Sequence, residues 1–507
     1  MDYLPILVDD INPGPGAAVP NGLSALGGQL LFSANDGISG FEPWISDGTA
    51  AGTVPLGDLL PGMIGSLPFG FVALGSQALF VATDDQQGRE LWVTDGTAIG
   101  TYLVIDLIEG SGSAAPTQLT SNNSQVFFTT NAGGLGNELW VSDGTAAGTV
   151  PAADINPGPM GSFPSQLTVA NGQLLFSAFT PTAGAELWVS DGTPESTTLV
   201  ADINPGAGSA LIGNITPVAN GTVFFAATSG DGRELWASDG TAAGTRLVAD
   251  INPTGSANPT ALAAVGDRVF FSANDGIHGQ ELWVSDGTAA GTQLVADLNP
   301  GTGGSAPAHL TAVGEVLFFT ANDGDSGTEL WVSDGTTAGT QRVVDLNPGR
   351  ASSSPNYLSA FDGNVFFSAS DGSLGTELWM SNGTASGTVL VADLNPGPAG
   401  SFPSQLTLVG DSLYFSANDG TVGTELWRID SANSGPVDDG LEIDYTSFSE
   451  TTALVFNGAA TQANNRLRLT PARQNQAGSV FYQEGFTLTD STSFETYFEF
   501  QIGSGQG

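Results

Sequence analysis

Short hydrophobic stretches separated by turn-forming residues alternate along most of the chain. In residues 261–299, four apolar or alternating stretches lie around residues 262–265, 268–273, 281–285 and 293–298. Between them stand Val-Gly-Asp, Asn-Asp-Gly and Ser-Asp-Gly-Thr, which favour turns because glycine tolerates positive φ and Asx side chains bond to their own backbone. No window shows a 3.6-residue period, so the pattern predicts a meander of four antiparallel strands.

This unit of about 48 residues recurs nine times. All nine tryptophans are in phase, at steps of 48 residues and one step of 47: Trp44, Trp92, Trp140, Trp188, Trp236, Trp283, Trp331, Trp379 and Trp427. A four-stranded unit at this period is typical of a propeller blade. Radial stacking would bury the tryptophans and the Phe pair, for example Phe270 and Phe271, which no blade can bury alone. We therefore predict an all-β, nine-bladed β-propeller, with an open or split array as the alternative because nine blades exceed the usual number.

The two ends of the repeat region complement each other. The ninth unit stops at Asp430, directly after its tryptophan strand, and lacks the strand that closes the other units, such as Leu294-Val-Ala-Asp297 in the sixth unit. Residues 3–14 supply that missing sequence, since they align with residues 293–301. Pairing residues 4–11 with residues 425–430 would complete the ninth blade and leave no unpaired sheet edge. We therefore predict a ring closed by the N-terminal strand.

After residue 430 the repeat stops and the composition changes. Residues 431–440 have the composition of a linker. Alternating stretches then indicate the strands of a different β-domain at residues 454–459, 466–470, 478–482 and 494–500. The predicted domains are a propeller at 1–430, a linker at 431–440 and a second β-domain at 441–507.

The charge of the chain limits its partners. Fifty-two acidic residues stand against ten basic ones, giving a net charge of -42. We therefore expect neither nucleic acid nor an anionic membrane surface as a partner, because both require a cationic surface. No apolar run is long enough for a membrane helix, so we expect no membrane insertion. The first ten residues do not resemble a signal peptide, so either export uses another route or the natural N-terminus is missing.

Three acidic positions recur in the repeat and are candidates for binding chemistry. The simpler reading is structural, because an Asp in a turn caps backbone N–H groups and a Glu can tie strands or blades. The other reading is that oxygen-rich loops such as Asn274-Asp275-Gly276 bind calcium, although their spacing differs from the Asp-x-Asp-x-Asp-Gly loop. Calcium therefore stays open as a cofactor, and no metal-ligand set is assigned. The Asp-Gly-Thr turn position carries Asp in eight copies and Asn382 in the remaining one; the other two sets are Glu42, Glu90, Glu138, Glu186, Glu234, Glu281, Glu329, Glu377 and Glu425, and Asp10, Asp58, Asp106, Asp154, Asp202, Asp250, Asp297, Asp345 and Asp393.

No constellation for catalysis is visible. Gly324-Asp325-Ser326-Gly327 imitates the surroundings of a serine-protease nucleophile, but other copies carry different residues there, which is typical of a variable hairpin loop. His278 and His309 lie at different phases of the repeat, so neither is expected to complete a triad. There is also no phosphate loop, cysteine pair or histidine cluster. We predict that the chain is not an enzyme, and we nominate no catalytic or binding residue.

Two family resemblances follow from particular motifs. Glu-Leu-Trp-Val-Ser-Asp-Gly-Thr-Ala-Ala-Gly-Thr at residues 138–149 and 281–292 resembles the ELWxxDGT repeat of large exported bacterial proteins. The resemblance covers residues 1–430, with departures at Pro43, at Asn382 and after Trp427. It implies a secreted or cell-surface protein.

The C-terminal part resembles the first strands of the legume-type lectin sandwich. An Asn-Gly-Ala step, a Leu-Thr strand, a Gly-Ser-x-Phe-Tyr strand and a Phe-x-Thr-x-Phe-x-Phe strand follow one another within residues 448–507. In that family the sugar- and metal-binding residues come later than residue 507. The resemblance therefore implies an incomplete lectin-like sandwich and no site residue in this chain.

The function that these observations favour is extracellular recognition or adhesion without catalysis, with glycans or other cell-surface components as partners. An enzyme that uses carboxylates at the centre of the propeller is one alternative. A purely structural spacer in a large surface protein is another. The ligand and the oligomeric state are left open.

Overall fold

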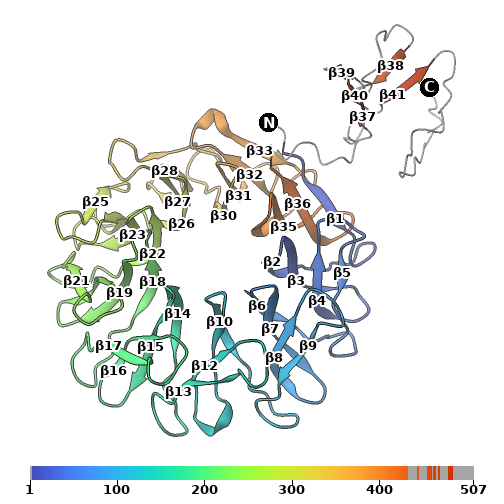
Figure 1. The fold of residues 1–507 in the computed structure, drawn as a ribbon. Coiled ribbons are helices and arrows are strands. Elements are labelled where there is room, and N and C mark those ends of the chain that lie inside the picture. Colours follow the sequence, from blue (N-terminus) through green and yellow to red (C-terminus); the bar gives the residue numbers. More distant parts are fainter. Residues whose placement is uncertain are drawn as a thin grey trace. The chain divides into compact units, whose positions relative to one another are not determined.

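The computed structural model describes residues 3–431, 442–444, 454–458, 461–463, 466–468 and 478–482. The chain divides into two compact units, Met1–Ala432 and Asn433–Gly507. The first unit is a ring of nine four-stranded antiparallel sheets (Figure 1), as predicted. Among the described residues, no helix is long and apolar enough to cross a membrane.

Each of the first eight blades is a meander of four consecutive strands. Blades 1 to 3 comprise β2 (Asn21–Leu26), β3 (Gln29–Asn35), β4 (Phe41–Ser46) and β5 (Val54–Pro55); β6 (Phe69–Leu74), β7 (Gln77–Asp84), β8 (Gly88–Thr94) and β9 (Tyr102–Ile105); and β10 (Thr117–Ser121), β11 (Val126–Thr130), β12 (Glu138–Ser142) and β13 (Val150–Ala153). Blades 4 to 6 comprise β14 (Ser165–Ala170), β15 (Gln173–Thr180), β16 (Gly184–Ser190) and β17 (Thr198–Ala201); β18 (Gly213–Pro217), β19 (Val223–Ser229), β20 (Gly232–Ser238) and β21 (Arg246–Ala249); and β22 (Thr260–Val265), β23 (Arg268–Asn274), β24 (Gln280–Ser285) and β25 (Gln293–Ala296). Blades 7 and 8 comprise β26 (Ala308–Val313), β27 (Val316–Asn322), β28 (Thr328–Ser333) and β29 (Gln341–Arg342); and β30 (Asn356–Phe361), β31 (Asn364–Ser370), β32 (Thr376–Ser381) and β33 (Thr388–Ala392). Two short 3-10 turns, η1 (Ala132–Gly134) and η2 (Ala385–Gly387), lie in blades 3 and 8.

The ninth blade closes the ring with both ends of the unit. Its strands are β34 (Ser404–Val409), β35 (Ser412–Asn418), β36 (Thr424–Asp430) and, on the outside, the N-terminal strand β1 (Ile6–Asp9). β1 pairs antiparallel with β36, with Ile6 opposite Arg428 and Leu7 opposite Trp427. The first strands of neighbouring blades face the centre of the ring (Figure 1), and each contacts the next, including β34 with β2. The closed ring is therefore confirmed, and the open array is excluded.

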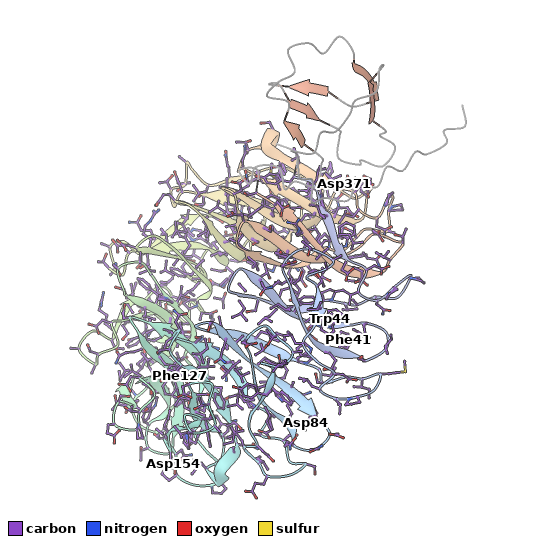
Figure 2. All side chains as sticks on the ribbon, turned by 45° about the vertical axis from the view of Figure 1, so that its right-hand side comes forward. Phe41, Trp44, Asp84, Phe127, Asp154 and Asp371 are labelled. Atoms are coloured by element: carbon purple, nitrogen blue, oxygen red, sulfur yellow. The ribbon has the colours of Figure 1, made fainter. Side chains whose placement is uncertain are left out.

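The hydrophobic core lies between the blades. Phe127 and Leu139 of blade 3 pack against Leu174 and Phe176 of blade 4, and similar clusters recur around the ring. Figure 2 shows the side chains of the propeller, with Phe127 and Trp44 among those labelled. Each blade buries its apolar side chains against the blades on both sides. The same hydrophobic pattern is therefore needed in every blade, and the sequence repeats once per blade.

The tryptophans occupy one register in every blade. Each stands opposite a phenylalanine of the preceding strand, as Trp283 does with Phe271 and Trp331 with Phe319. Six tryptophans are buried, and the prediction that they belong to the core is confirmed for them. The other three are half-buried and pack against the core clusters: Trp188, Trp236 and Trp283.

The second unit contains five short strands within its described residues. β37 (Glu442–Asp444), β40 (Arg466–Arg468) and β39 (Thr461–Ala463) form one sheet in that order, and β38 (Leu454–Gly458) pairs with β41 (Gly478–Tyr482). Three of the predicted strands are therefore present. The fourth, at residues 494–500, and nearly all of the predicted linker at 431–440 lie outside the described residues.

Candidate functional site

The glutamate before each tryptophan is buried in all nine blades. In blade 6, Glu281 accepts hydrogen bonds from the backbone N–H groups of Leu298 and Asn299, both at 3.2 Å, and of Ser305 at 2.8 Å. The Ser305 hydroxyl donates a further bond at 2.5 Å. These donors lie in the loop that carries the chain into the next blade. The glutamate therefore caps the connection between blades, in agreement with the structural reading.

The residue that faces this glutamate divides the blades into two groups. Five blades have a serine there, whose hydroxyl donates to the carboxylate, and four have an alanine. Burial raises the pKa of all nine glutamates. It raises the pKa to about 7 for Glu90, Glu186 and Glu425, which all face an alanine. The serines are Ser66, Ser162, Ser305, Ser353 and Ser401, and the alanines are Ala18, Ala114, Ala210 and Ala257.

The aspartate of the Asp-Gly-Thr turn serves its own loop. Asp286 accepts from the backbone N–H of Thr288 at 2.9 Å and from its hydroxyl at 2.7 Å, and these bonds lower the pKa of the carboxyl. In blade 8, Asn382 accepts the same two bonds from Thr384, at 3.0 and 2.7 Å. Because a neutral amide replaces the carboxylate without changing the bonds, the turn needs an acceptor and not a charge.

The third recurring aspartate caps the loop between blades. Asp10 and Asp345 each accept a hydrogen bond from the backbone N–H four residues later, at 3.2 and 3.3 Å. Their other carboxylate oxygens are buried without a hydrogen-bond partner, and their charge contributes to the raised pKa of Glu425 and Glu329. In the loop considered for calcium, Asp275 accepts from the backbone N–H groups of Ile277 and His278. Among the described residues, no group of three or more acidic or histidine side chains could hold a metal ion.

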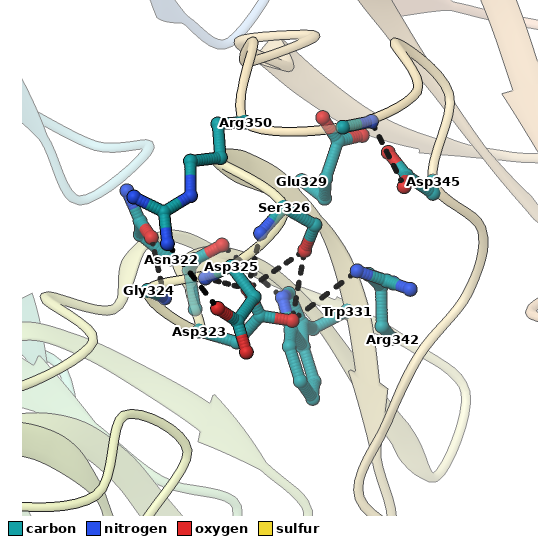
Figure 3. Close-up of polar contacts among 12 residues, drawn as sticks. Asn322, Asp323, Gly324, Asp325, Ser326, Glu329, Trp331, Arg342, Asp345 and Arg350 are labelled. Carbon is teal, nitrogen blue, oxygen red and sulfur yellow. Dashed lines mark hydrogen bonds and ion pairs between the residues drawn. The ribbon is translucent and has the colours of Figure 1, made fainter.

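The loop that imitates a nucleophile motif is held together by its own polar contacts (Figure 3). The hydroxyl of Ser326 donates to Asp323, whose oxygens lie at 2.7 and 2.8 Å, and Arg342 lies 3.2 Å from the same carboxylate. Neither histidine contacts this serine. His278 lies in blade 6, where it contacts Asp275 at 2.7 Å, and His309 lies on β26. The structure therefore brings neither histidine to Ser326.

A different set of residues lines the inside of the ring and was not identified from the sequence. The second residue of every innermost strand has positive φ and lies within a shift of the strand register, so each innermost strand carries a β-bulge there. A bulge changes the direction of a side chain. We call these residues the inner-ring positions: Gly22, Gly70, Gln118, Gln166, Asn214, Ala261, His309, Tyr357 and Gln405.

Glutamines at the inner-ring positions join neighbouring blades. The side-chain oxygen of Gln118 accepts from the backbone N–H of Gln166 at 3.1 Å, and that of Gln166 accepts from Asn214 at 3.0 Å. Gln405 makes the same bond to Gly22 at 3.1 Å, across the closure from blade 9 to blade 1. In these blades the inner-ring residue therefore has a structural role.

A second circle of residues precedes the inner-ring positions by three residues. They also have positive φ, and most of their N–H groups bond to the preceding blade, as Phe163 does with Asn137 and Phe402 with Thr376, both at 3.0 Å. Several are exposed apolar side chains, with Phe402 at 62% and Phe163 at 55%. We call them the rim positions: Val19, Leu67, Ala115, Phe163, Leu211, Asn258, Ala306, Ser354 and Phe402.

Comparison with known proteins gives one family and several solved structures. Residues 441–507 match the legume lectin domain family. No curated protein matches the chain. Puromycin hydrolase is 14% identical with a TM-score of 0.37, and the match covers 71% of this chain and 60% of that one. A prolyl endopeptidase is 13% identical with a TM-score of 0.40, covering 69% and 54%. The β-propeller domain of the Trilobed protease from Pyrococcus furiosus, described as having an open velcro topology, is 11% identical with a TM-score of 0.36, covering 74% and 98%.

These matches correct one prediction. The prediction that the chain is not an enzyme is contradicted, because the similar solved structures are those of a hydrolase and of peptidases. The chain spans about 60% of the length of the puromycin hydrolase that it matches. Identities of 11% to 14% and TM-scores of 0.36 to 0.40 assign no activity to this chain.

Proposed function

We propose that this protein recognises carbohydrates outside the cell. The observation that carries the proposal is the match of residues 441–507 to the legume lectin domain. The net charge of -42 agrees with it, because the surface is unsuited to nucleic acid and to anionic membranes. Glycans and other cell-surface components are then the partners, and a secreted or bacterial cell-surface location follows from the resemblance to the ELWxxDGT repeat.

The organisation of the chain fits this role. We propose a propeller at residues 1–430, a linker at 431–440 and a legume-lectin-like sandwich at 441–507. The recurring carboxylates of the propeller cap their own loops, so they are engaged in building the ring. The alternative of an enzyme with carboxylates at the centre of the ring would need acidic residues on the innermost strands. None of these nine strands contains Asp or Glu.

A glycan array probed with the whole labelled chain tests the proposal. We expect saturable binding to a defined subset of glycans, inhibited by the corresponding free sugar. Thermally unfolded protein serves as the control for non-specific adsorption. If natively folded protein at tens of micromolar binds no glycan above that control, carbohydrate recognition is wrong for this chain, and a spacer role gains support.

A further inference from the structure

The innermost strands of this strongly acidic protein carry no charged residue of their own. The nine innermost strands contain no Asp, Glu, Lys or Arg, and neither do the inner-ring positions or the rim positions. Elsewhere the chain carries 52 acidic and 10 basic residues. The missing charge is not a consequence of burial, since Tyr357 is 46% exposed and Phe402 is 62% exposed. An exposed surface of this kind indicates contact with an uncharged partner.

Backbone strain identifies the inner-ring residues that the fold does not require. Positive φ is unfavourable for bulky residues and costs glycine nothing. Gly22 and Gly70 occupy inner-ring positions with the same bulge, so the ring can be built without a side chain there. Blades 7 and 8 nevertheless have His309 and Tyr357, each with φ of 52°. Strain retained at such positions points to function.

Neither of these two side chains bridges blades as the glutamines do. His309 Nδ1 lies 3.3 Å from the hydroxyl of Thr320, within its own blade. The Thr320 hydroxyl donates to the carbonyl of Ala308 at 3.2 Å, so it is placed to accept a hydrogen bond from His309 Nδ1–H. In that neutral tautomer, Nε2 is the hydrogen-bond acceptor of the imidazole. Among the described residues, the hydroxyl of Tyr357 has no hydrogen-bond partner. Both residues are exposed.

The two residues lie on adjacent innermost strands, and an exposed aromatic residue precedes the innermost strand of the following blade. The innermost strands β26, β30 and β34 of blades 7, 8 and 9 contact one another in sequence. His309 and Tyr357 lie on the first two, and Phe402 precedes the third by two residues. This arc therefore combines two aromatic faces, an imidazole acceptor and a phenol hydroxyl, with no charged residue on its strands.

We infer that this arc of blades 7 to 9 binds a neutral oligosaccharide. The rings of Tyr357 and Phe402 offer apolar faces for the C–H surface of a sugar ring. His309 Nε2 accepts a hydrogen bond from a sugar hydroxyl, and the Tyr357 hydroxyl donates one. The absence of arginine and carboxylate from the strands disfavours acidic sugars and amino sugars. The inference rests on the proposed function and places a binding site in the propeller itself.

Replacing Tyr357 with glycine separates binding from folding. Tyr357→Gly removes the aromatic ring and also relieves the positive φ, as Gly22 and Gly70 do in blades 1 and 2. We expect an unchanged or higher melting temperature together with an affinity for neutral oligosaccharides that is at least about tenfold weaker, the loss expected for one aromatic contact. Tyr102→Ala is the matched control, because Tyr102 is 48% exposed on the outer strand β9.

The experiment uses the whole chain, the neutral and acidic oligosaccharides of the array, and titration calorimetry with the best neutral binder. Loss of affinity in Tyr357→Gly alone supports the site. If the parent binds glycans and Tyr357→Gly binds them equally well, or if only acidic glycans bind, the inner-ring site is wrong while carbohydrate recognition stands. If the parent binds no glycan, both the proposed function and the site are wrong.

Discussion

Blade 2 offers a direct test of how the buried glutamates act. Glu90 accepts hydrogen bonds from the backbone N–H groups of Ala114 at 2.8 Å and Leu107 at 3.2 Å, and burial raises its pKa to about 7. In blade 1 the equivalent residue is Ser66, whose hydroxyl donates to Glu42 at 2.6 Å. Ala114→Ser should therefore add the bond that five blades already have.

The expected gain follows from this bond. A hydrogen bond to a charged group contributes about 1.5–3 kcal/mol. An unfolding entropy of about 2.1 cal/mol/K per residue, taken over about 430 residues of the ring, gives about 0.9 kcal/mol/K, so the melting temperature should rise by about 2–3 °C. The native pKa of Glu90 lies above its unfolded value of 4.5. The stability it contributes is therefore fully present below pH 4.5 and is lost as the pH rises to about 7.

The pH dependence distinguishes this mechanism from simple packing. The added hydroxyl favours the ionised form and lowers the pKa of Glu90, so the gain should be large at pH 8 and small at pH 4. Scanning calorimetry at both values measures it, and hydrogen exchange of the Leu107 and Ala114 amides reports it locally. The reciprocal change Ser305→Ala should lower the melting temperature at pH 8. Ala152→Ser, which puts a hydroxyl among buried apolar side chains, should lower it at both pH values.

Equal gains at pH 4 and pH 8 would refute the reasoning, because the glutamate would then not act as an ionised acceptor. The reasoning would also be refuted if Ala114→Ser lowered the melting temperature at pH 8 while Ser305→Ala left the melting temperature unchanged.

Three further results are expected. Deleting residues 3–12 removes β1 and exposes the edge of β36, so the variant should aggregate on size-exclusion chromatography; a monomer with the parent's unfolding curve would contradict the closure. Trp427→Ala should lower the free energy of unfolding by about 3–5 kcal/mol in denaturant titrations, because a buried aromatic ring leaves a cavity. Asn382→Asp should change it by less than about 0.5 kcal/mol, since the turn needs only an acceptor; a larger change would show that the charge matters.

The sequence predicted the blades and their closure because both depend on local, repeated signals. Turn residues at fixed offsets mark the strand ends, and residues 3–14 visibly repeat a closing strand. The depth of burial was less predictable. Trp188 and Trp283 stand in the same Glu-Leu-Trp-Val-Ser segment as the buried Trp140 and Trp331 but are half-buried, so this segment alone does not determine the exposure of its tryptophan.

The inner ring could not be predicted in the same way. Glutamine and tyrosine do not favour positive φ, so Gln118 and Tyr357 give no local sign of their conformation. Gly22, Gly70, Asn214 and His309, at the same phase of the repeat, belong to residue types that adopt positive φ more readily. The conformation comes from tertiary structure, since each innermost strand must pair within its blade and contact the strands of two neighbours.

The repeat itself indicates where function should be sought. A residue present in every blade, such as the buried glutamate, is explained by the connection that each blade needs, and nine equal copies cannot distinguish one side of the ring from another. A ligand smaller than the ring must be recognised by positions that differ between blades. At the inner-ring positions the same backbone carries glycine in two blades and histidine or tyrosine in two others, although glycine would be less strained. We therefore attribute His309 and Tyr357 to ligand recognition and not to a structural role in joining the blades.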